Sequence, residues 1–159
     1  MAERIRRLPR GRHGLTREQV RASQRGRILA AMAEAVADKG FVRVTVADVL
    51  AHAGVSRETF YEQFADKEEC FLAVLDTGAE GLLEILSAAV SLPIDDPLER
   101  LDRMLQAYLT TLTAEPAFAK AFLVDAYGAG PRATERRVLL QQRFVDAVAD
   151  VLGLAREPV

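Results

Sequence analysis

Four hydrogen-bonding side chains lie close together in the middle of the chain: Arg57, Thr59, Tyr61 and Gln63. A guanidinium can make two parallel hydrogen bonds to a guanine, and hydroxyl and amide groups can bind phosphate oxygens or base edges. The apolar residues around them are expected to face a core, which leaves the four polar side chains free. Their types and spacing therefore indicate a surface that binds nucleic acid.

Two short helices joined by a tight turn are expected to position these side chains. Thr45 can accept a hydrogen bond at the start of the first helix, and Gly54 can adopt the positive φ that ends it. Ser56 can cap the second helix, which is expected over 57–64. The residues whose spacing predicts packing between the two helices are Val49, Leu50, Ala53, Val55, Phe60 and Phe64. Such a unit places its second helix in the major groove of DNA.

The composition favours an all-α fold of about seven helices. Half of the 159 residues are hydrophobic and 28% are charged, so the chain can bury a core. Tryptophan is absent, and β-branched residues do not alternate with polar ones over any useful length. Besides the two short helices, we expect helices over 17–39, from 67 to near Pro93, from Pro97 past Leu112, over 117–127 and over 132–152.

Several of these helices carry clear local signals. Thr16 and Asp66 each begin a pattern typical of a helix N-terminus. Gly78 and Gly81 interrupt the long helix after Asp66 and are expected to mark close packing or a bend. The clearest amphipathic stripe is predicted at Leu98, Leu101, Leu105, Tyr108 and Leu112.

Positive charge is concentrated at the N-terminal end. Residues 1–27 contain nine arginines and two glutamates, a net charge of +7, so the remaining residues carry −9. Residues 1–15 are expected to form a basic flexible arm, which either reaches DNA or only aids solubility. The arginines of the first helix that could face a phosphate backbone are Arg17, Arg21, Arg25 and Arg27.

Nothing in the sequence indicates an enzyme. His13, His52 and Cys70 make no set with the spacing of a nucleophile and its base, or of a metal site. We therefore expect no catalytic residue, no metal and no cofactor, with Cys70 as a small buried hydrophobe and His52 exposed. No apolar run reaches the ~20 residues of a membrane span, and no apolar signal region follows the first arginines, which predicts a cytoplasmic protein.

The segment over 40–71 reads GFVRVTVADVLAHAGVSRETFYEQFADKEECF. Its characteristic pieces are Gly40-Phe41, Thr45, Ala53-Gly54-Val55-Ser56, Thr59-Phe60-Tyr61, Phe64 and Lys67-Glu68. In these pieces and in their order, the segment closely resembles the N-terminal DNA-binding domain of TetR-family transcriptional regulators. With the first helix, the resemblance covers about residues 16–75, whereas the second half of the chain matches only in the arrangement of its helices.

The resemblance implies a helix-turn-helix domain over 16–66, with its motif at 45–64, and a helical regulatory domain over 67–159. It implies a transcriptional regulator, expected to be a repressor, that binds a palindromic operator in double-stranded DNA as a homodimer. A small-molecule effector would release it. The residues that the resemblance assigns to DNA binding are Arg43, Thr45, Ser56, Arg57, Thr59, Tyr61, Gln63 and Lys67.

The C-terminal end departs from the family pattern. Family members generally continue with two further helices that form the dimer interface, whereas this sequence stops at Val159. We expect an incomplete regulatory domain, in which either the last two helices supply the dimer contact or the chain is a truncated form. The alternative function is a helical interaction module without DNA binding, or a truncated heterodimerising partner of such a regulator.

A pocket for an effector is expected between the helices of the second half. The side chains that could line it are Met104, Tyr108, Phe118, Phe122 and Asp125. Asp125 would orient the ligand. Packing in a hydrophobic core is the alternative for each of the aromatic residues.

Overall fold

The computed structural model describes residues 16–91, 96–151 and 153, and these form α-helices and two short 3₁₀ helices without a β-strand. The elements are α1 (Arg17–Lys39), η1 (Phe41–Arg43), α2 (Val46–Ala53), α3 (Arg57–Tyr61), α4 (Lys67–Ala89), α5 (Pro97–Ala114), α6 (Pro116–Leu123), η2 (Asp125–Gly128) and α7 (Pro131–Val151). The expected all-α fold with seven helices is confirmed. The basic arm predicted over 1–15 lies outside the described residues, and α4 ends at Ala89, before its predicted end at Pro93.

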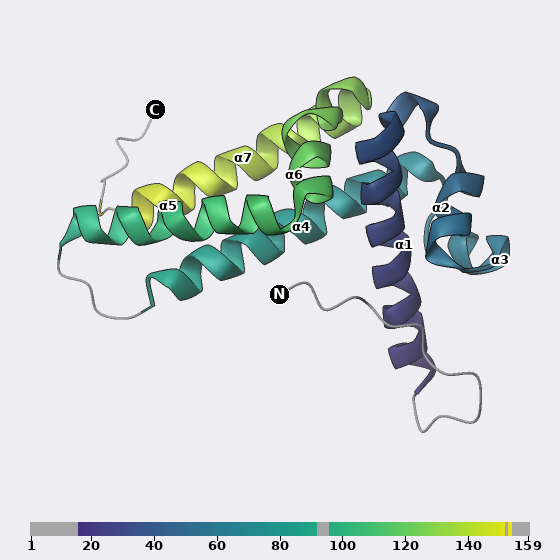
Figure 1. The fold of residues 1–159 in the computed structure, drawn as a ribbon, viewed down its shortest axis with the longest axis horizontal. Helices are drawn as coiled ribbons and strands as arrows, with labels where there is room; N and C mark the ends of the chain where they lie inside the picture. The colour runs from purple at the N-terminus through teal and green to yellow at the C-terminus, as the bar shows by residue number, and fades with distance from the viewer. Residues whose placement is uncertain (1–15, 92–95, 152, 154–159) are drawn as a thin grey trace.

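Two parts of the molecule meet at α1 and α4 (Figure 1). The helices α2 and α3 lie on one side of α1, and α6 lies on the other. The long helices α4, α5 and α7 form an extended bundle, and α4 packs against α1 at one end of it. The DNA-binding unit predicted from the sequence is therefore attached to the bundle through two packed helices.

Side-chain caps define the helix-turn-helix as predicted. The Thr45 hydroxyl accepts a hydrogen bond from the backbone N–H of Asp48, and the Ser56 hydroxyl accepts one from that of Thr59. Gly54 ends α2 with φ 61° and ψ 42°, a left-handed conformation in which a side chain costs free energy. These local preferences set the angle between α2 and α3.

One hydrophobic core runs from the DNA-binding unit into the bundle. Its largest fully buried side chains include Phe60 of α3, Phe71 and Leu75 of α4, and Met32 of α1. Cys70 is buried in this core as predicted, and burial raises the pKa of its thiol to about 12. The thiol therefore stays protonated and contributes as an apolar group.

Two predicted helices are shorter in the structure. The helix predicted over 57–64 ends at Tyr61, because the next residues turn toward the cap of α4 and bury Phe64. The helix predicted over 117–127 is interrupted at Val124, whose φ of −120° and ψ of −59° leave the helical path. This break allows η2 to bury Ala126 against α7.

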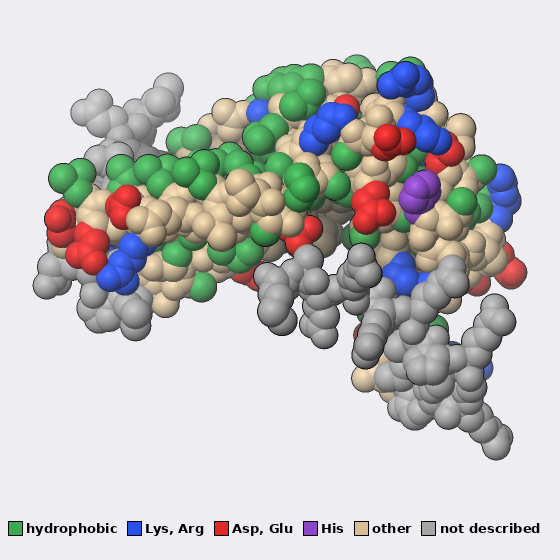
Figure 2. Space-filling view, in the orientation of Figure 1, with side chains coloured by type: hydrophobic (Ala, Val, Ile, Leu, Met, Phe, Trp, Pro, Cys, Tyr) green, Lys and Arg blue, Asp and Glu red, His purple; other side chains and the backbone are tan. Residues whose placement is uncertain are grey.

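The predicted apolar stripe of α5 is partly wrong. Leu98 and Leu105 are 73% and 48% exposed, whereas Met104 is buried. The helix contacts its neighbours over a narrow face, because α4 and α7 cover it from one side only (Figure 1). Hydrophobic side chains consequently remain in a band along α5 in the space-filling view (Figure 2).

Candidate nucleic-acid interface

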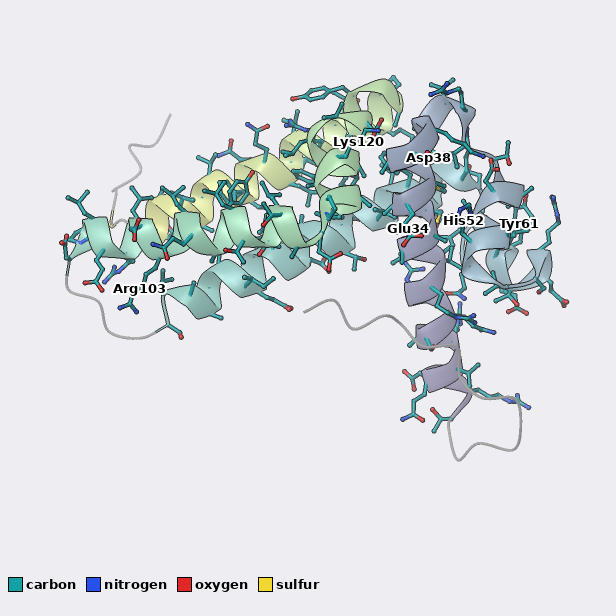
Figure 3. The ribbon with its side chains drawn as sticks, viewed as in Figure 1. Glu34, Asp38, His52, Tyr61, Arg103 and Lys120 are labelled. Atoms are coloured by element: carbon teal, nitrogen blue, oxygen red, sulfur yellow. The ribbon has the colours of Figure 1, made fainter. Side chains whose placement is uncertain are left out.

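The structure brings the eight predicted DNA-binding residues to one end of the molecule but exposes them unequally. Arg43, Thr45, Ser56, Arg57 and Tyr61 are exposed, whereas Thr59, Gln63 and Lys67 are half-buried. Tyr61 lies at the outer edge of the unit (Figure 3).

Arg57 is the predicted residue with the greatest freedom to bind a partner. It occupies the first position of α3, is exposed, and has no hydrogen bond or ion pair with another described residue. The hydroxyls of Ser56 and Thr59 lie beside it, 2.9 Å apart. A guanidinium next to two hydroxyls at a helix N-terminus can read a base edge and bind the adjacent phosphate.

Lys67 is held inside the protein. Its ammonium donates hydrogen bonds to the backbone carbonyls of Phe41, Val42 and Val44 at 3.1, 3.3 and 2.9 Å. It also lies 4.6 Å from the centre of the Phe41 ring. These hydrogen bonds tie α4 to the segment before α2. Because an ammonium has only three N–H donors, none is left for a phosphate.

The side-chain amide of Gln63 is turned into the protein. Both polar atoms of its side-chain amide are buried without a hydrogen-bond partner among the described residues. The helix ends two residues earlier, so Gln63 does not continue the face that carries Arg57 and Tyr61. Its assignment to a phosphate therefore depends on a rearrangement of this turn.

Arginines of α1 hold the ends of the two short helices. Arg27 Nη1 donates to the carbonyl of Ala53, the last residue of α2, at 3.1 Å. Arg21 Nη2 donates to the carbonyl of Glu62 at the end of α3, at 3.3 Å. The sequence predicted these arginines on a phosphate-facing surface, whereas the structure directs them at helix C-termini, where the dipole favours a cation.

Arg25 is a third arginine of α1 that contacts the helix-turn-helix. Its guanidinium lies 4.5 Å from the centre of the Phe64 ring, an arrangement in which the positive charge faces the negative ring surface. The side chain thus covers the residue that anchors the segment after α3. The spacing of four between Arg21 and Arg25 predicted a shared helical face, but only the fold shows what that face touches.

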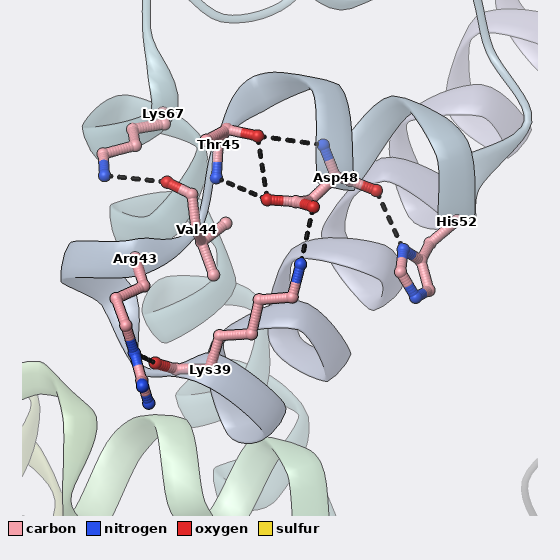
Figure 4. A network of polar contacts seen from close by, with 7 residues as sticks. All are labelled: Lys39, Arg43, Val44, Thr45, Asp48, His52 and Lys67. Carbon is pink, nitrogen blue, oxygen red and sulfur yellow. Dashed lines mark hydrogen bonds and ion pairs between the residues drawn. The ribbon is translucent and has the colours of Figure 1, made fainter.

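A second polar network fixes the N-terminus of α2 (Figure 4). One carboxylate oxygen of Asp48 lies 2.6 Å from the Lys39 ammonium of α1. The other accepts hydrogen bonds from the backbone N–H and the hydroxyl of Thr45, at 2.9 and 2.8 Å. The Lys39 ammonium and the Thr45 donors hold the pKa of the Asp48 carboxyl well below its usual range.

This network predicts a specific acid sensitivity. The folded state favours the Asp48 carboxylate, so its contribution is complete above the unfolded pKa of ~3.9 and is lost as the pH falls below that value. We expect the free energy of unfolding of wild type to fall more steeply between about pH 5 and about pH 3 than that of Asp48→Asn. Urea unfolding followed by circular dichroism at each pH measures the difference, and parallel profiles for the two proteins would contradict it.

Three of the five predicted effector-binding residues line a cavity in the bundle. This inner cavity has a volume of about 190 Å³, and its walls include Tyr108 of α5 with Phe118 and Phe122 of α6. Met104 and Asp125 do not line it. Sequence reasoning missed Arg137 of α7, which does, because a single arginine on a helix gives no sign of which side of a bundle it faces.

Met104 and Asp125 have other positions. Met104 is 3% exposed and packs in the bundle. Asp125 lies in η2 at the junction with the DNA-binding unit, where a side-chain Cβ at Gly40 would be 3.8 Å from its carboxylate. The helix predicted over 117–127 includes this residue, but the break at Val124 turns Asp125 away from the cavity.

Charged side chains connect α6 with α1 and α7 with α4. The Lys120 ammonium of α6 donates to the carbonyl of Ala37 in α1, close to Asp38 (Figure 3). Arg132 of α7 lies 3.1 Å from the carboxylate of Glu68 in α4. Lys120 thus links α6, which lines the inner cavity, to α1 of the DNA-binding unit, and Arg132 links α7 to the start of α4.

Two other kinds of site are absent from the described residues. No group of three or more histidine, cysteine or acidic side chains is arranged to hold a metal ion in this part of the chain. No helix over residues 16–91 and 96–151 is both long and apolar enough to cross a membrane.

Comparison with known proteins identifies the family. Residues 28–74 match the model for bacterial regulatory proteins of the tetR family. An uncharacterized HTH-type transcriptional regulator of Mycobacterium bovis is 30% identical over 137 residues, which are 86% of this chain and 68% of the relative. The chain belongs to the TetR family. Its matched relatives are transcription regulators, which are not enzymes.

Other regulators are similar to this chain in sequence or in fold. The regulator EthR of Mycolicibacterium smegmatis is 28% identical over 82% of this chain, which spans 59% of EthR. A TetR-family regulator of Marinobacter aquaeolei superposes with a TM-score of 0.71 at 24% identity, covering 84% of this chain and 70% of that one. The fatty acid degradation regulator FadR of Bacillus halodurans superposes at 0.74 with 16% identity, covering 81% and 66%. At these identities the superpositions show the shared fold alone.

Proposed function

We propose that this TetR-family protein is a sequence-specific DNA-binding repressor that a small molecule releases from its operator. The observation that carries the proposal is Arg57, which is exposed and unpaired at the start of a helix fixed by its neighbours. The α1 arginines and the Lys39–Asp48 pair hold that helix unit in place before DNA arrives. Such preorganisation lowers the entropy cost of binding.

The inner cavity supports control by a ligand. It is lined mostly by apolar and aromatic side chains with a few polar groups, which is typical of small-molecule sites. Phe118 and Phe122 belong to α6, and α6 also carries the Lys120 contact to α1. A ligand that displaces α6 would therefore shift the helix that supports the recognition unit, and would change DNA affinity in the cytoplasm, where we expect the protein to act.

A homodimer on a palindromic operator is part of the proposal. One α3 contacts only a few base pairs, and a second copy one helical turn away doubles the recognised sequence. Exposed apolar side chains of α7 offer a surface for such a contact: Val138, Leu139 and Val145. This supports the sequence-based suggestion that the last helices take part in dimerisation.

The test is selection of bound fragments from random duplex DNA, with the oligomeric state measured by light scattering in parallel. We expect an inverted repeat whose half-sites are about one helical turn apart, bound by a dimer. A monomeric protein that selects no sequence would contradict this function and favour the helical interaction module.

A further inference from the structure

A second cavity, which we call the α1 groove, lies between α1, α4 and the corner that joins α5 to α6. Its volume is about 380 Å³, and its walls include Leu29, Ala30 and Ala33 of α1 and Ile85 of α4. Unlike the inner cavity, it includes residues of the DNA-binding unit among its walls. A molecule in this groove would touch α1 directly.

Phe118 lies in the wall that the two cavities share. Phe118 and Leu82 line both of them. A Cβ built on Gly78 would lie 1.6 Å from the Phe118 ring, so the ring rests directly on the backbone of α4. This contact explains a glycine inside a long helix, where it weakens the helix, and confirms the close packing expected there. No such neighbour lies within 4 Å of a Cβ built at Gly81.

Movement of the Phe118 ring would open the shared wall beside Leu82. Phe118 is half-buried, and its ring stacks on that of Phe122 at a centroid distance of 6.0 Å. The contacts of Phe118 with Gly78 and Phe122 are apolar, so rotation of the ring out of the wall breaks no side-chain hydrogen bond. The result is one elongated apolar channel from α7 to α1.

The two ends of this channel differ in charge. Arg137 lies in the wall of the inner cavity, held by hydrogen bonds from Nε to the carbonyl of Phe122 at 3.1 Å and from Nη1 to the side-chain oxygen of Gln141 at 2.8 Å. Its other guanidinium nitrogen, Nη2, can still donate to a ligand. The α1 groove instead carries the carboxylates of Glu34 and Glu115. An anionic group therefore fits the inner end and is repelled at the groove.

We propose that the two cavities form one site for a linear apolar molecule with a carboxylate or similar anionic end. The anionic end binds Arg137, the chain passes Phe118, and its far end occupies the groove against Leu29, Ala30 and Ala33 of α1. At roughly 30 Å³ for a group of the size of a water molecule or a methylene, the inner cavity holds about six such groups and the groove about twelve. This inference rests on the proposed ligand control and names the chemistry and extent of its site.

The test is the affinity of straight-chain carboxylates as a function of chain length, measured by calorimetry on the protein without DNA. With both cavities in use, the affinity should rise by up to about fourfold for each added methylene, from about six to about fourteen carbons. Straight-chain alcohols of equal length should bind at least about tenfold more weakly, because they lack the charge that pairs with Arg137. A plateau at about eight carbons, or alcohols that bind as well as carboxylates, would overturn the proposal.

Ala30→Trp tests the groove separately. Ala30 is exposed on α1, so a larger side chain fills the groove without entering the core. We expect the longest carboxylates to bind Ala30→Trp at least about tenfold more weakly than wild type, which corresponds to about two fewer buried methylenes. The affinity of the shortest carboxylates should be unchanged. The chain has no other tryptophan, so the fluorescence of this indole should also change when long chains bind.

Ala22→Trp is the matched control. Ala22 is also exposed on α1 but does not line the groove, and its chain-length profile should equal that of wild type. Equal profiles for Ala30→Trp and Ala22→Trp would overturn the groove site. Operator binding without any carboxylate binding would refute this inference and leave the proposed function intact, whereas carboxylate binding by a protein that selects no operator would refute the proposed function alone.

Discussion

Arg57→Ala is expected to remove most of the preference for the operator over unrelated DNA. The exposed guanidinium at the start of α3 can make a bidentate contact to a guanine, which is worth about 1 to 3 kcal/mol of discrimination. The operator affinity should therefore fall by roughly 5-fold to 150-fold, while the affinity for a scrambled duplex changes much less. Fluorescence anisotropy with the two labelled duplexes at one salt concentration measures both.

His52→Ala is the matched control for this experiment. His52 is exposed on α2, and its ring lies 2.8 Å from the carbonyl of Asp48 within the same helix (Figure 4). Its removal should leave the ratio of the two affinities within about twofold of wild type. If Arg57→Ala also kept that ratio, base recognition would have to be assigned to another face of the unit.

Phe60→Ala is expected to detach the recognition helix from its core. Phe60 is fully buried, and the centroid of its ring lies 5.4 Å from the ring centroid of Tyr61 and 5.6 Å from that of Phe64. Truncation of a buried phenylalanine costs about 3 to 5 kcal/mol. Since a domain has only about 5 to 15 kcal/mol of stability, the midpoint of urea unfolding should fall sharply and DNA binding should be lost.

Tyr61→Phe separates packing from recognition at the next position. Tyr61 is 48% exposed, so loss of its hydroxyl should change the free energy of unfolding by less than about 0.5 kcal/mol. Circular dichroism during urea unfolding compares the two variants. A Phe60→Ala protein with the stability of Tyr61→Phe would show that Phe60 does not anchor α3 in solution.

Helix boundaries that depend on local chemistry could be predicted from the sequence. The bounds of α1 are those expected, because the Thr16 capping box and Gly40 act on residues next to them in the chain. The turn at Gly54 and the cap at Ser56 are predictable for the same reason. The helix-turn-helix consists almost wholly of such short-range signals.

Contacts between distant segments could not be predicted in the same way. Lys67 was assigned to a phosphate, yet its partners are carbonyls more than twenty residues earlier. Arg21 and Arg27 meet helix ends 41 and 26 residues away. Helical spacing shows on which side of its helix a residue lies. Which other segment packs against that side depends on how the helices cross.

Breaks in a helix have similar long-range causes. Asp125 was expected to line a cavity because it is a polar residue among apolar ones, in a helix predicted over 117–127. Burial of Ala126 against α7 ends that helix at Leu123 and moves Asp125 to the junction with Gly40. The amphipathic pattern alone could not distinguish these outcomes, since either path buries apolar residues.

The contacts of the α1 arginines also affect the expected salt dependence of DNA binding. Arg21, Arg25 and Arg27 add to the positive charge near the DNA-binding end, but their guanidinium groups are engaged with Glu62, Phe64 and Ala53. Only cations that replace counterions on phosphates contribute to the dependence of binding on salt. The number of counterions released on binding should therefore be smaller than the arginine content of this end of the chain suggests.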